Sequence, residues 1–184
     1  MNKDILRVLI DPQELDVIIS RVASEIERDY QNRDGRVLLL CILKGSVVFM
    51  GELMKRIDLP NLEIDFMKVS SYGSGTQTTG TVRIDLDILR RDLSMCDIII
   101  VEDIIDSGRT LSHLTEYLRL KGARSVKTCT LLDKPDRREV NFSPDYVGRV
   151  IPDEFVVGFG LDYDEKYRAL PYVGILRPEA YLNQ

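Results

Sequence analysis

Residues 98–111 read Ile98-Ile99-Ile100-Val101-Glu102-Asp103-Ile104-Ile105-Asp106-Ser107-Gly108-Arg109-Thr110-Leu111. The first four side chains are all apolar, which is typical of a central strand that is covered on both faces of a parallel sheet. Two carboxylates follow at once, a third comes shortly after, and a Ser-Gly-Arg-Thr turn then opens a helix that Gly122 ends. Ligands of open α/β sheets bind beyond the carboxyl ends of the strands. This run therefore predicts both a parallel sheet and the place of its site.

Two further apolar runs, 37–43 and 126–132, indicate neighbouring strands of the same sheet. The first is followed by a predicted helix over 47–56, and the second is preceded by the helix predicted over 111–121. Strands and helices that alternate in this order form a parallel sheet with helices on both faces. We therefore expect an α/β fold with a central parallel sheet flanked by helices, in one domain that spans residues 1–184.

The remaining elements lie near the two ends and around one polar loop. A helix is expected to begin at Asp11, because an N-cap aspartate, a proline and Glu14 form a typical helix start. Alternating apolar and polar side chains predict two half-exposed strands on either side of a polar, glycine-bearing loop over 70–80. The four remaining strand predictions are 64–66, 82–86, 155–161 and 172–176.

Composition and charge limit the classes of partner. The formal net charge is −5 and the chain has no run of lysines or arginines, whereas a nucleic-acid or membrane-surface partner normally requires a basic patch. The three cysteines are far apart and form no CxxC pair, which suits free thiols in a reducing compartment. The N-terminus lacks the basic-then-apolar pattern of a signal peptide. We expect a cytoplasmic protein that binds neither nucleic acid nor membrane.

The turn after the acids suits a phosphate group. Backbone N–H groups at a helix N-terminus, two hydroxyls and a guanidinium can all donate to phosphate oxygens, and Gly108 lets the backbone approach closely. Three carboxylates beside a phosphate would repel it unless a cation or a polyhydroxyl group lay between them. A sugar phosphate that binds Mg²⁺ meets both requirements, since Mg²⁺ takes one or two carboxylates together with substrate oxygens.

The motifs of other phosphate-binding families do not occur here: there is no GxxxxGK[ST] and no GxGxxG after a strand. Residues 101–111 instead closely resemble the signature that binds phosphoribosyl pyrophosphate (PRPP) in type I phosphoribosyltransferases, in the version of the hypoxanthine-guanine branch. The resemblance implies that family's fold, with a small hood beside the sheet and a flexible lid loop over 70–80. It covers roughly residues 38–176, through Leu43-Lys44-Gly45-Ser46, Ser70-Ser71-Tyr72-Gly73, Asp133-Lys134-Pro135 and Val157-Gly158-Phe159-Gly160-Leu161-Asp162-Tyr163.

The resemblance assigns roles around the sugar of PRPP. Asp106 matches the family's acid near N7 of the purine, which manages the proton that is lost as the N9 bond forms. Glu102 and Asp103 match the pair that holds the ribose hydroxyls and Mg²⁺. Ser107 and Arg109 stand where the family often has Thr and Lys, and they keep a hydroxyl and a cation. The residues that match the cradle of the 5′-phosphate are Ser107, Gly108, Arg109 and Thr110.

The resemblance also implies a pyrophosphate site and a lid. Lys44 and Gly45 match the pyrophosphate loop, where the family often has a cis peptide bond before the lysine. Arg168 would reach the same pyrophosphate. Ser71 and Tyr72 match a lid that closes over the site, and a lid makes physical sense because an oxocarbenium-like ribosyl intermediate must be shielded from water.

Four residues match the family's contacts to the base. Lys134 would donate to the 6-oxo group, although taken alone it is an ordinary surface lysine. Phe155 would stack on the purine ring, Val156 would meet its edge through backbone groups, and Asp162 would lie by the base and a second metal. His113 is expected to be an exposed helical residue, so a carboxylate is the natural acid–base group.

The implied reaction is the transfer of the phosphoribosyl group from PRPP to hypoxanthine or guanine, with Mg²⁺ as cofactor. Transfer to another base is the nearest alternative, although adenine carries an amino group that a lysine donor disfavours. Regulatory nucleic-acid-binding relatives usually lack an acid at the position of Asp106. A protein that binds PRPP without catalysis would have lost a key group, and none is missing. Family members commonly form homodimers or homotetramers, and the sequence does not choose between them.

Overall fold

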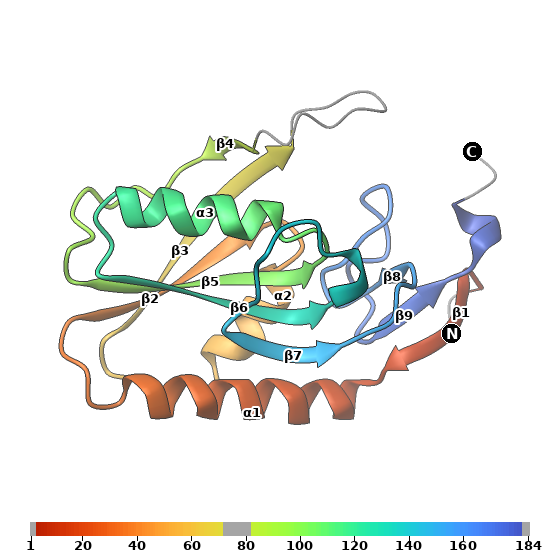
Figure 1. The fold of residues 1–184 in the computed structure, drawn as a ribbon. Coiled ribbons are helices and arrows are strands. Elements are labelled where there is room, and N and C mark those ends of the chain that lie inside the picture. Colours follow the sequence, from red (N-terminus) through yellow and green to blue (C-terminus); the bar gives the residue numbers. More distant parts are fainter. Residues whose placement is uncertain (1–2, 72–81, 182–184) are drawn as a thin grey trace.

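The structure is a computed structural model that describes residues 3–71 and 82–181. Its centre is a six-stranded sheet in the order β4-β3-β2-β5-β6-β7 (Figure 1). All neighbouring strands are parallel except β3 and β4, which are antiparallel. The predicted parallel sheet is therefore confirmed, with an antiparallel strand at one edge. The strands are β2 (Arg36–Leu43), β3 (Leu62–Ser71), β4 (Val82–Leu86), β5 (Cys96–Ile105), β6 (Ser125–Asp133) and β7 (Tyr146–Val150).

Helices cover both faces of this sheet. In Figure 1, α1 lies below the sheet and α3 above it, and α2 packs against the same core as α1. The predicted start of α1 is confirmed, since the backbone N–H of Glu14 donates to the Asp11 carboxylate at 2.8 Å and the Asp11 N–H donates back to Glu14 at 3.2 Å. Among the described residues, none of the helices is long and apolar enough to cross a membrane. Their bounds are α1 (Pro12–Tyr30), α2 (Val47–Met54) and α3 (Arg109–Leu120).

Strand β5 shows why the central run of the sequence is apolar on both faces. Ile99 and Val101 pack into the core beneath α1 and α2, and Ile98 and Ile100 pack into the core beneath α3. All four side chains are inaccessible to solvent. Because successive side chains of a strand point to opposite faces, each core takes every second residue.

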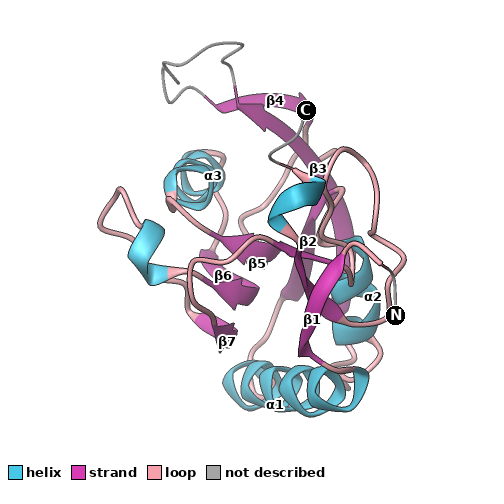
Figure 2. Cartoon of the chain, turned by 90° about the vertical axis from the view of Figure 1, so that its right-hand side faces the viewer, coloured by secondary structure: helices cyan, strands magenta, loops and turns pink. Residues whose placement is uncertain are grey.

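A second, smaller sheet lies beyond the carboxyl ends of the central strands. Its order is β1-β9-β8, with antiparallel pairs, and Figure 2 looks along the strands with β1 in front of the main sheet. This sheet corresponds to the expected hood. Its strands are β1 (Ile5–Ile10), β8 (Val156–Val157) and β9 (Val173–Leu176), and two single 3₁₀ turns, η1 (Pro135–Arg137) and η2 (Pro178–Ala180), complete the elements.

The strand prediction over 155–161 is wrong in its length. Only β8 is extended, because the chain then reverses: the N–H of Gly158 donates to the carbonyl of Leu161 at 3.0 Å, and the N–H of Leu161 donates back at 3.1 Å. Gly158 has φ of 96°, a backbone conformation that favours glycine. The apolar character of this segment therefore reflects its burial and not an extended strand.

The topology reverses between β2 and β5. From β2 the chain crosses by α2 to β3 on one side, and from β5 it crosses by α3 to β6 on the other side. In open α/β sheets the crevice at such a switch point is where ligands bind. Here it brings together the ends of β2 and β5, and thus the loop at Lys44 and the acids from Glu102 onward.

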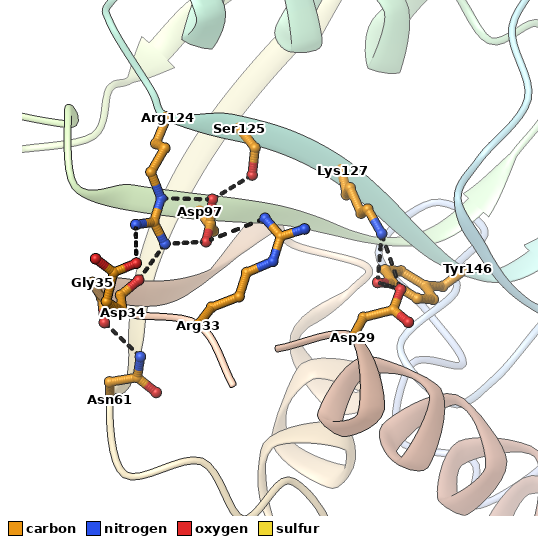
Figure 3. Close-up of polar contacts among 10 residues, drawn as sticks. All are labelled: Asp29, Arg33, Asp34, Gly35, Asn61, Asp97, Arg124, Ser125, Lys127 and Tyr146. Carbon is orange, nitrogen blue, oxygen red and sulfur yellow. Dashed lines mark hydrogen bonds and ion pairs between the residues drawn. The ribbon is translucent and has the colours of Figure 1, made fainter. Parts of the chain in front are cut away.

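The opposite end of the sheet carries a separate polar network (Figure 3). The fully buried Asp97 accepts hydrogen bonds from Nε of Arg124 at 3.1 Å and from the Ser125 hydroxyl at 2.6 Å. Nearby, Asp29 binds Lys127 and the Tyr146 hydroxyl at 3.0 and 2.7 Å. These contacts join the last turn of α1 to β6 and β7, and the amino end of β5 to the start of β6, so they stabilise the fold away from the switch point.

Candidate active site

The acids at the end of β5 point into two different cavities. The sequence predicts that the strand ends before them, but β5 continues to Ile105, so Glu102 and Asp103 lie within the strand. Their side chains therefore leave opposite faces of the sheet. Glu102 lines a cavity at the start of α3, which we call the turn cavity, and Asp103 lines a second one beside Phe155, the hood cavity.

The turn cavity combines a helix N-terminus and two hydroxyls, which suit an anion, with the carboxylates of Glu102 and Asp106. Gly108 has φ of 80° and lets the chain enter α3, whose first N–H groups face this end of the sheet. Arg109 does not line the cavity, because its guanidinium donates to the carboxylate of Glu139 at 2.6 Å. The cavity is lined by Glu102, Ile104, Ile105, Asp106, Ser107, Gly108, Thr110 and Leu111.

The hood cavity combines four apolar residues with three carboxylates and one buried cation. The side chain of Lys134 is only 9 % exposed, so it is not the surface lysine that an isolated reading would suggest. Its Nζ lies 3.9 Å from a carboxylate oxygen of Asp106 and 3.7 Å from one of Asp153. The lining residues are Asp103, Ile104, Asp106, Lys134, Phe155, Val156, Leu161 and Asp162.

Asp106 and Ile104 line both cavities. Oδ1 of Asp106 is buried, yet it has no hydrogen-bond partner among the described residues. Arg138 donates to the backbone carbonyl of Asp106, which fixes the turn while leaving the carboxylate available. A ligand that occupies both cavities would therefore have Asp106 beside each of its parts.

Burial sets the electrostatics of the two acids in β5. Burial, and to a lesser degree the neighbouring Asp103 charge, raises the pKa of Glu102 well above its usual range. Burial also raises the pKa of Asp103 to about 6, although the Ile104 N–H, which donates to it at 2.8 Å, and the Arg168 charge act in the opposite direction. Oε2 of Glu102 is buried without a hydrogen-bond partner among the described residues. Both acids thus favour the approach of a cation or of hydroxyl donors.

This arrangement fits Mg²⁺ only as a metal that takes most of its ligands from substrate and water. Within the described part of the chain, no three acidic, histidine or cysteine side chains lie close enough to hold a metal by themselves. Mg²⁺ commonly binds in this way, through one or two carboxylates and substrate oxygens. The candidate ligands are Asp103 and Asp162, which share the hood cavity, and Glu102 on the other side of β5.

The loop after β2 approaches the acids closely. The peptide bond between Leu43 and Lys44 is cis, as the family resemblance implies. A Cβ atom on Gly45 would lie 1.7 Å from a carboxylate oxygen of Asp103, so a larger residue there would displace that carboxylate. Nη1 of Arg168 binds the Asp162 carboxylate at 3.0 Å. The predicted pyrophosphate residues thus lie next to the predicted metal ligands.

Phe155 is held by two tyrosines that sequence reasoning missed. Its ring stacks on Tyr181 with centroids 4.8 Å apart and meets Tyr163 edge-on at 5.5 Å. Neither tyrosine lines the hood cavity, whereas Phe155 does. The same cavity has Ile104 in its lining, so it offers apolar contacts to a flat ring from both side chains. The contact with Tyr181 could not be read from sequence, because it joins segments that are not neighbours in the chain.

The other predicted site residues divide into two groups. Val156 lines the hood cavity, and His113 is exposed on α3, as expected. The side chain of Ser71 and the whole of Tyr72 lie outside the described residues, as does most of the predicted lid. Sequence reasoning also missed Glu165, whose carboxylate binds both Lys44 and Arg168.

Comparison with known proteins identifies the family of this chain. Residues 9–164 match the model of the phosphoribosyl transferase domain. The chain is 46 % identical over 185 residues to a hypoxanthine-guanine phosphoribosyltransferase of Staphylococcus aureus (strain N315), and the match covers the whole of both chains. It is also 50 % identical to the bifunctional protein TilS/HprT of Listeria monocytogenes, of which it spans only 27 % of the length.

Solved structures show the same fold. A hypoxanthine phosphoribosyltransferase from Staphylococcus aureus superposes with a TM-score of 0.91 at 44 % identity, and 98 % of each chain is covered. A hypoxanthine phosphoribosyl transferase from Trypanosoma cruzi superposes with a TM-score of 0.92 at 37 % identity, over 100 % of this chain and 97 % of that one. The expected fold is therefore confirmed, and the chain belongs to the phosphoribosyl transferase domain family and, within it, to the hypoxanthine-guanine phosphoribosyltransferases, which are enzymes of purine salvage.

Proposed function

We propose that the protein transfers the 5-phosphoribosyl group of PRPP to N9 of hypoxanthine or guanine, which yields IMP or GMP and pyrophosphate. The observation that carries this proposal is the position of Asp106, which lines both the turn cavity and the hood cavity. PRPP would place its 5′-phosphate in the turn cavity and the base would occupy the hood cavity. The bond between C1 of the ribose and N9 of the base then forms beside Asp106.

The turn cavity suits the phosphorylated sugar. The hydroxyls of Ser107 and Thr110 and the N–H groups at the start of α3 would donate to the 5′-phosphate. Glu102, whose buried oxygen has no partner among the described residues, would accept from a ribose hydroxyl. Arg109 would contribute its backbone and charge at a distance, because its guanidinium binds Glu139.

The hood cavity suits a 6-oxopurine. Lys134 is a buried cation and would donate to the 6-oxo group, whereas the amino group of adenine offers it no acceptor. Phe155 would stack on the base, and Val156 would meet its edge through backbone groups. Asp106 would take the proton that the base loses near N7 as the new bond forms.

The cations at the end of β2 suit the leaving group. Lys44, the N–H of Gly45 and Arg168 would bind the pyrophosphate and stabilise the charge that develops on it. Mg²⁺, held by Asp103 and Asp162 with Glu102 nearby, would add positive charge at the same oxygens. A lid over residues 70–80, with Ser71 and Tyr72, would exclude water from the ribosyl intermediate.

The test is a spectrophotometric assay with PRPP and Mg²⁺, in which hypoxanthine, guanine, xanthine, adenine and uracil are offered separately. We expect nucleotide from hypoxanthine or guanine, little from adenine or uracil, and loss of the activity when Mg²⁺ is chelated. Turnover of adenine alone would contradict the assignment of Lys134, and turnover of uracil alone would contradict a purine as the substrate. The lack of product from every base would overturn the proposed reaction.

We also propose that the 184 residues form one domain that acts in the cytoplasm as a homodimer or homotetramer. Family members commonly assemble in this way, and the described cysteines are all free and buried, which suits a reducing compartment. A mass in solution of two or four times 21.1 kDa is expected from light scattering.

A further inference from the structure

The loop that carries Arg168 contains an unusual turn. Tyr163 and Lys166 exchange two backbone hydrogen bonds of 3.2 and 3.0 Å, and the two residues between them, Asp164 and Glu165, have φ of 51° and 61°. Two-residue turns with positive φ at both central positions favour Asn or Asp at the first and Gly at the second. This chain places Glu165 where glycine is favoured, so its side chain is the feature to explain.

The carboxylate of Glu165 bridges the two cations that would bind pyrophosphate. Its Oε1 lies 3.1 Å from Nζ of Lys44, and its Oε2 lies 3.2 Å from Nη2 of Arg168. One oxygen faces each cation, as two oxygens of a bound phosphate group would. Glu165 adopts a backbone conformation that is easier for glycine. Its carboxylate thereby lies between Lys44 and Arg168.

The turn is anchored, whereas the carboxylate remains accessible. The N–H of Glu165 donates to Asp162 at 2.9 Å, and Asp162 also binds Nη1 of Arg168 at 3.0 Å. The side chains of Glu165 and Lys44 are 64 % and 55 % exposed. Exposed ion pairs are weak, so an incoming anion of higher charge can displace the carboxylate without disturbing the turn.

We propose that Glu165 takes the place of the pyrophosphate group between Lys44 and Arg168 in the free enzyme, so that it competes with pyrophosphate and promotes its release. This inference rests on the proposed function, because it requires that Lys44 and Arg168 bind pyrophosphate. When the product leaves, both cations regain an anionic partner at once. The cost of separating pyrophosphate from two positive charges is thereby reduced.

The test is calorimetric titration of the whole protein with inorganic pyrophosphate, with and without Mg²⁺, and it does not depend on turnover. Glu165→Gln keeps the size of the side chain and removes its charge, and it should bind pyrophosphate about 3- to 10-fold more tightly than the wild type, as expected for the loss of two exposed ion pairs. Asp164→Asn is the matched control, since it removes one charge from the same turn but pairs with Lys166 at 3.0 Å. It should change the dissociation constant less than twofold.

A second variant separates the charge from the backbone. Glu165→Gly fits the left-handed conformation better, so it should melt no lower than the wild type and bind pyrophosphate as tightly as Glu165→Gln. Equal or weaker binding in both Glu165 variants would overturn the inference. Lys44→Gln tests the site itself: if it leaves pyrophosphate binding unchanged, the assignment of the pyrophosphate site is wrong, and the role of Glu165 is overturned with it.

Discussion

Asp106 combines two properties that a general base requires at this point of the molecule. It lies where the turn cavity meets the hood cavity, and its Oδ1 is buried without a hydrogen-bond partner among the described residues. The nearest cation is Lys134, whose Nζ lies 3.9 Å from that oxygen, beyond hydrogen-bond distance. The turn therefore holds the carboxylate in place while its Oδ1 makes no hydrogen bond to the described residues. This oxygen can accept a proton from a bound base.

The Asp106→Asn variant should lower kcat by about 10²–10⁴, which is the usual contribution of a positioned acid–base group. The amide keeps the shape of the carboxylate but cannot accept the purine proton. Initial rates at saturating PRPP and guanine measure the effect, and circular dichroism checks that the variant is folded. Turnover within threefold of the wild type would remove Asp106 from the proton transfer.

Single residues differ in how far their roles can be predicted from the sequence. The acids and the turn after β5 were found because carboxylates directly after an apolar strand are unusual. Lys134 could not be distinguished from a surface lysine without the resemblance, since neither its burial nor its ion pair with Asp153, 19 residues on, follows from the local sequence. Glu165 was missed because a glutamate in a charged loop gives no signal of its positive φ.

Among the elements, β5 carries a residue that stabilises the fold at one end and residues of the site at the other. Its amino end carries the buried Asp97 (Figure 3). Its carboxyl end carries Glu102 and Asp103. Burial alone would raise the pKa of Asp97, but the hydrogen bonds from Arg124 and Ser125 prevail and hold that pKa below its ordinary value. The ionised form is thus the stable one in the folded protein, and Asp97 faces Ser125 in the register of β5 against β6.

The Asp97→Asn variant should lower the free energy of unfolding by about 2–4 kcal/mol, because it leaves the guanidinium of Arg124 without its buried anionic partner. Since the folded pKa is depressed, this stabilisation is complete above the unfolded pKa of about 4 and is lost as the pH falls through the folded pKa. Urea unfolding at pH 7 and below pH 4 measures it. The variant should lose less stability than the wild type upon acidification.

Asp34→Asn is the matched control for this prediction. Asp34 binds the same Arg124 side chain at 3.1 Å, but its own side chain is 92 % exposed. An exposed pair of this kind contributes little, so the variant should change the free energy of unfolding by less than about 1 kcal/mol. Equal losses in the two variants would show that burial of Asp97 does not determine the effect.

The sequence predicts the helices and the buried strands better than the strands at the edges of the sheets. The helices and the buried parallel strands follow from local patterns, and the start of α1 was predicted to the residue. Strands β1 and β7 were missed, because a strand at the edge of its sheet needs a partner that the sequence does not reveal: β1 pairs with β9 from the other end of the chain. The reversal after β8 was missed because a buried turn and a buried extended strand both appear in the sequence as a run of apolar residues.

For the molecule as a whole, the site consists of parts that no single element supplies. The switch point contributes the ends of β2 and β5, α3 contributes its N-terminus, and the hood closes the far side with Phe155 and the loop at Asp162 (Figures 1 and 2). Glu102 and Asp103 are half-buried in the free protein, and their raised pKa values mean that folding makes their ionisation less favourable. A bound ligand that brings cations or hydroxyl donors to these acids should therefore stabilise the entire fold.

Thermal unfolding should show directly how much a bound ligand stabilises the fold. PRPP at about 100 times its dissociation constant, with Mg²⁺ present, adds about 2.7 kcal/mol to the free energy of unfolding, which for a chain of this size raises Tm by about 5–10 °C. The same PRPP concentration in EDTA should give less than half of that shift, because the pyrophosphate then meets the acids without an intervening cation. Asp106→Asn is the control: it acts on the base proton and should keep the full shift. An equal shift with and without Mg²⁺ would show that Glu102, Asp103 and Asp162 do not act through a metal.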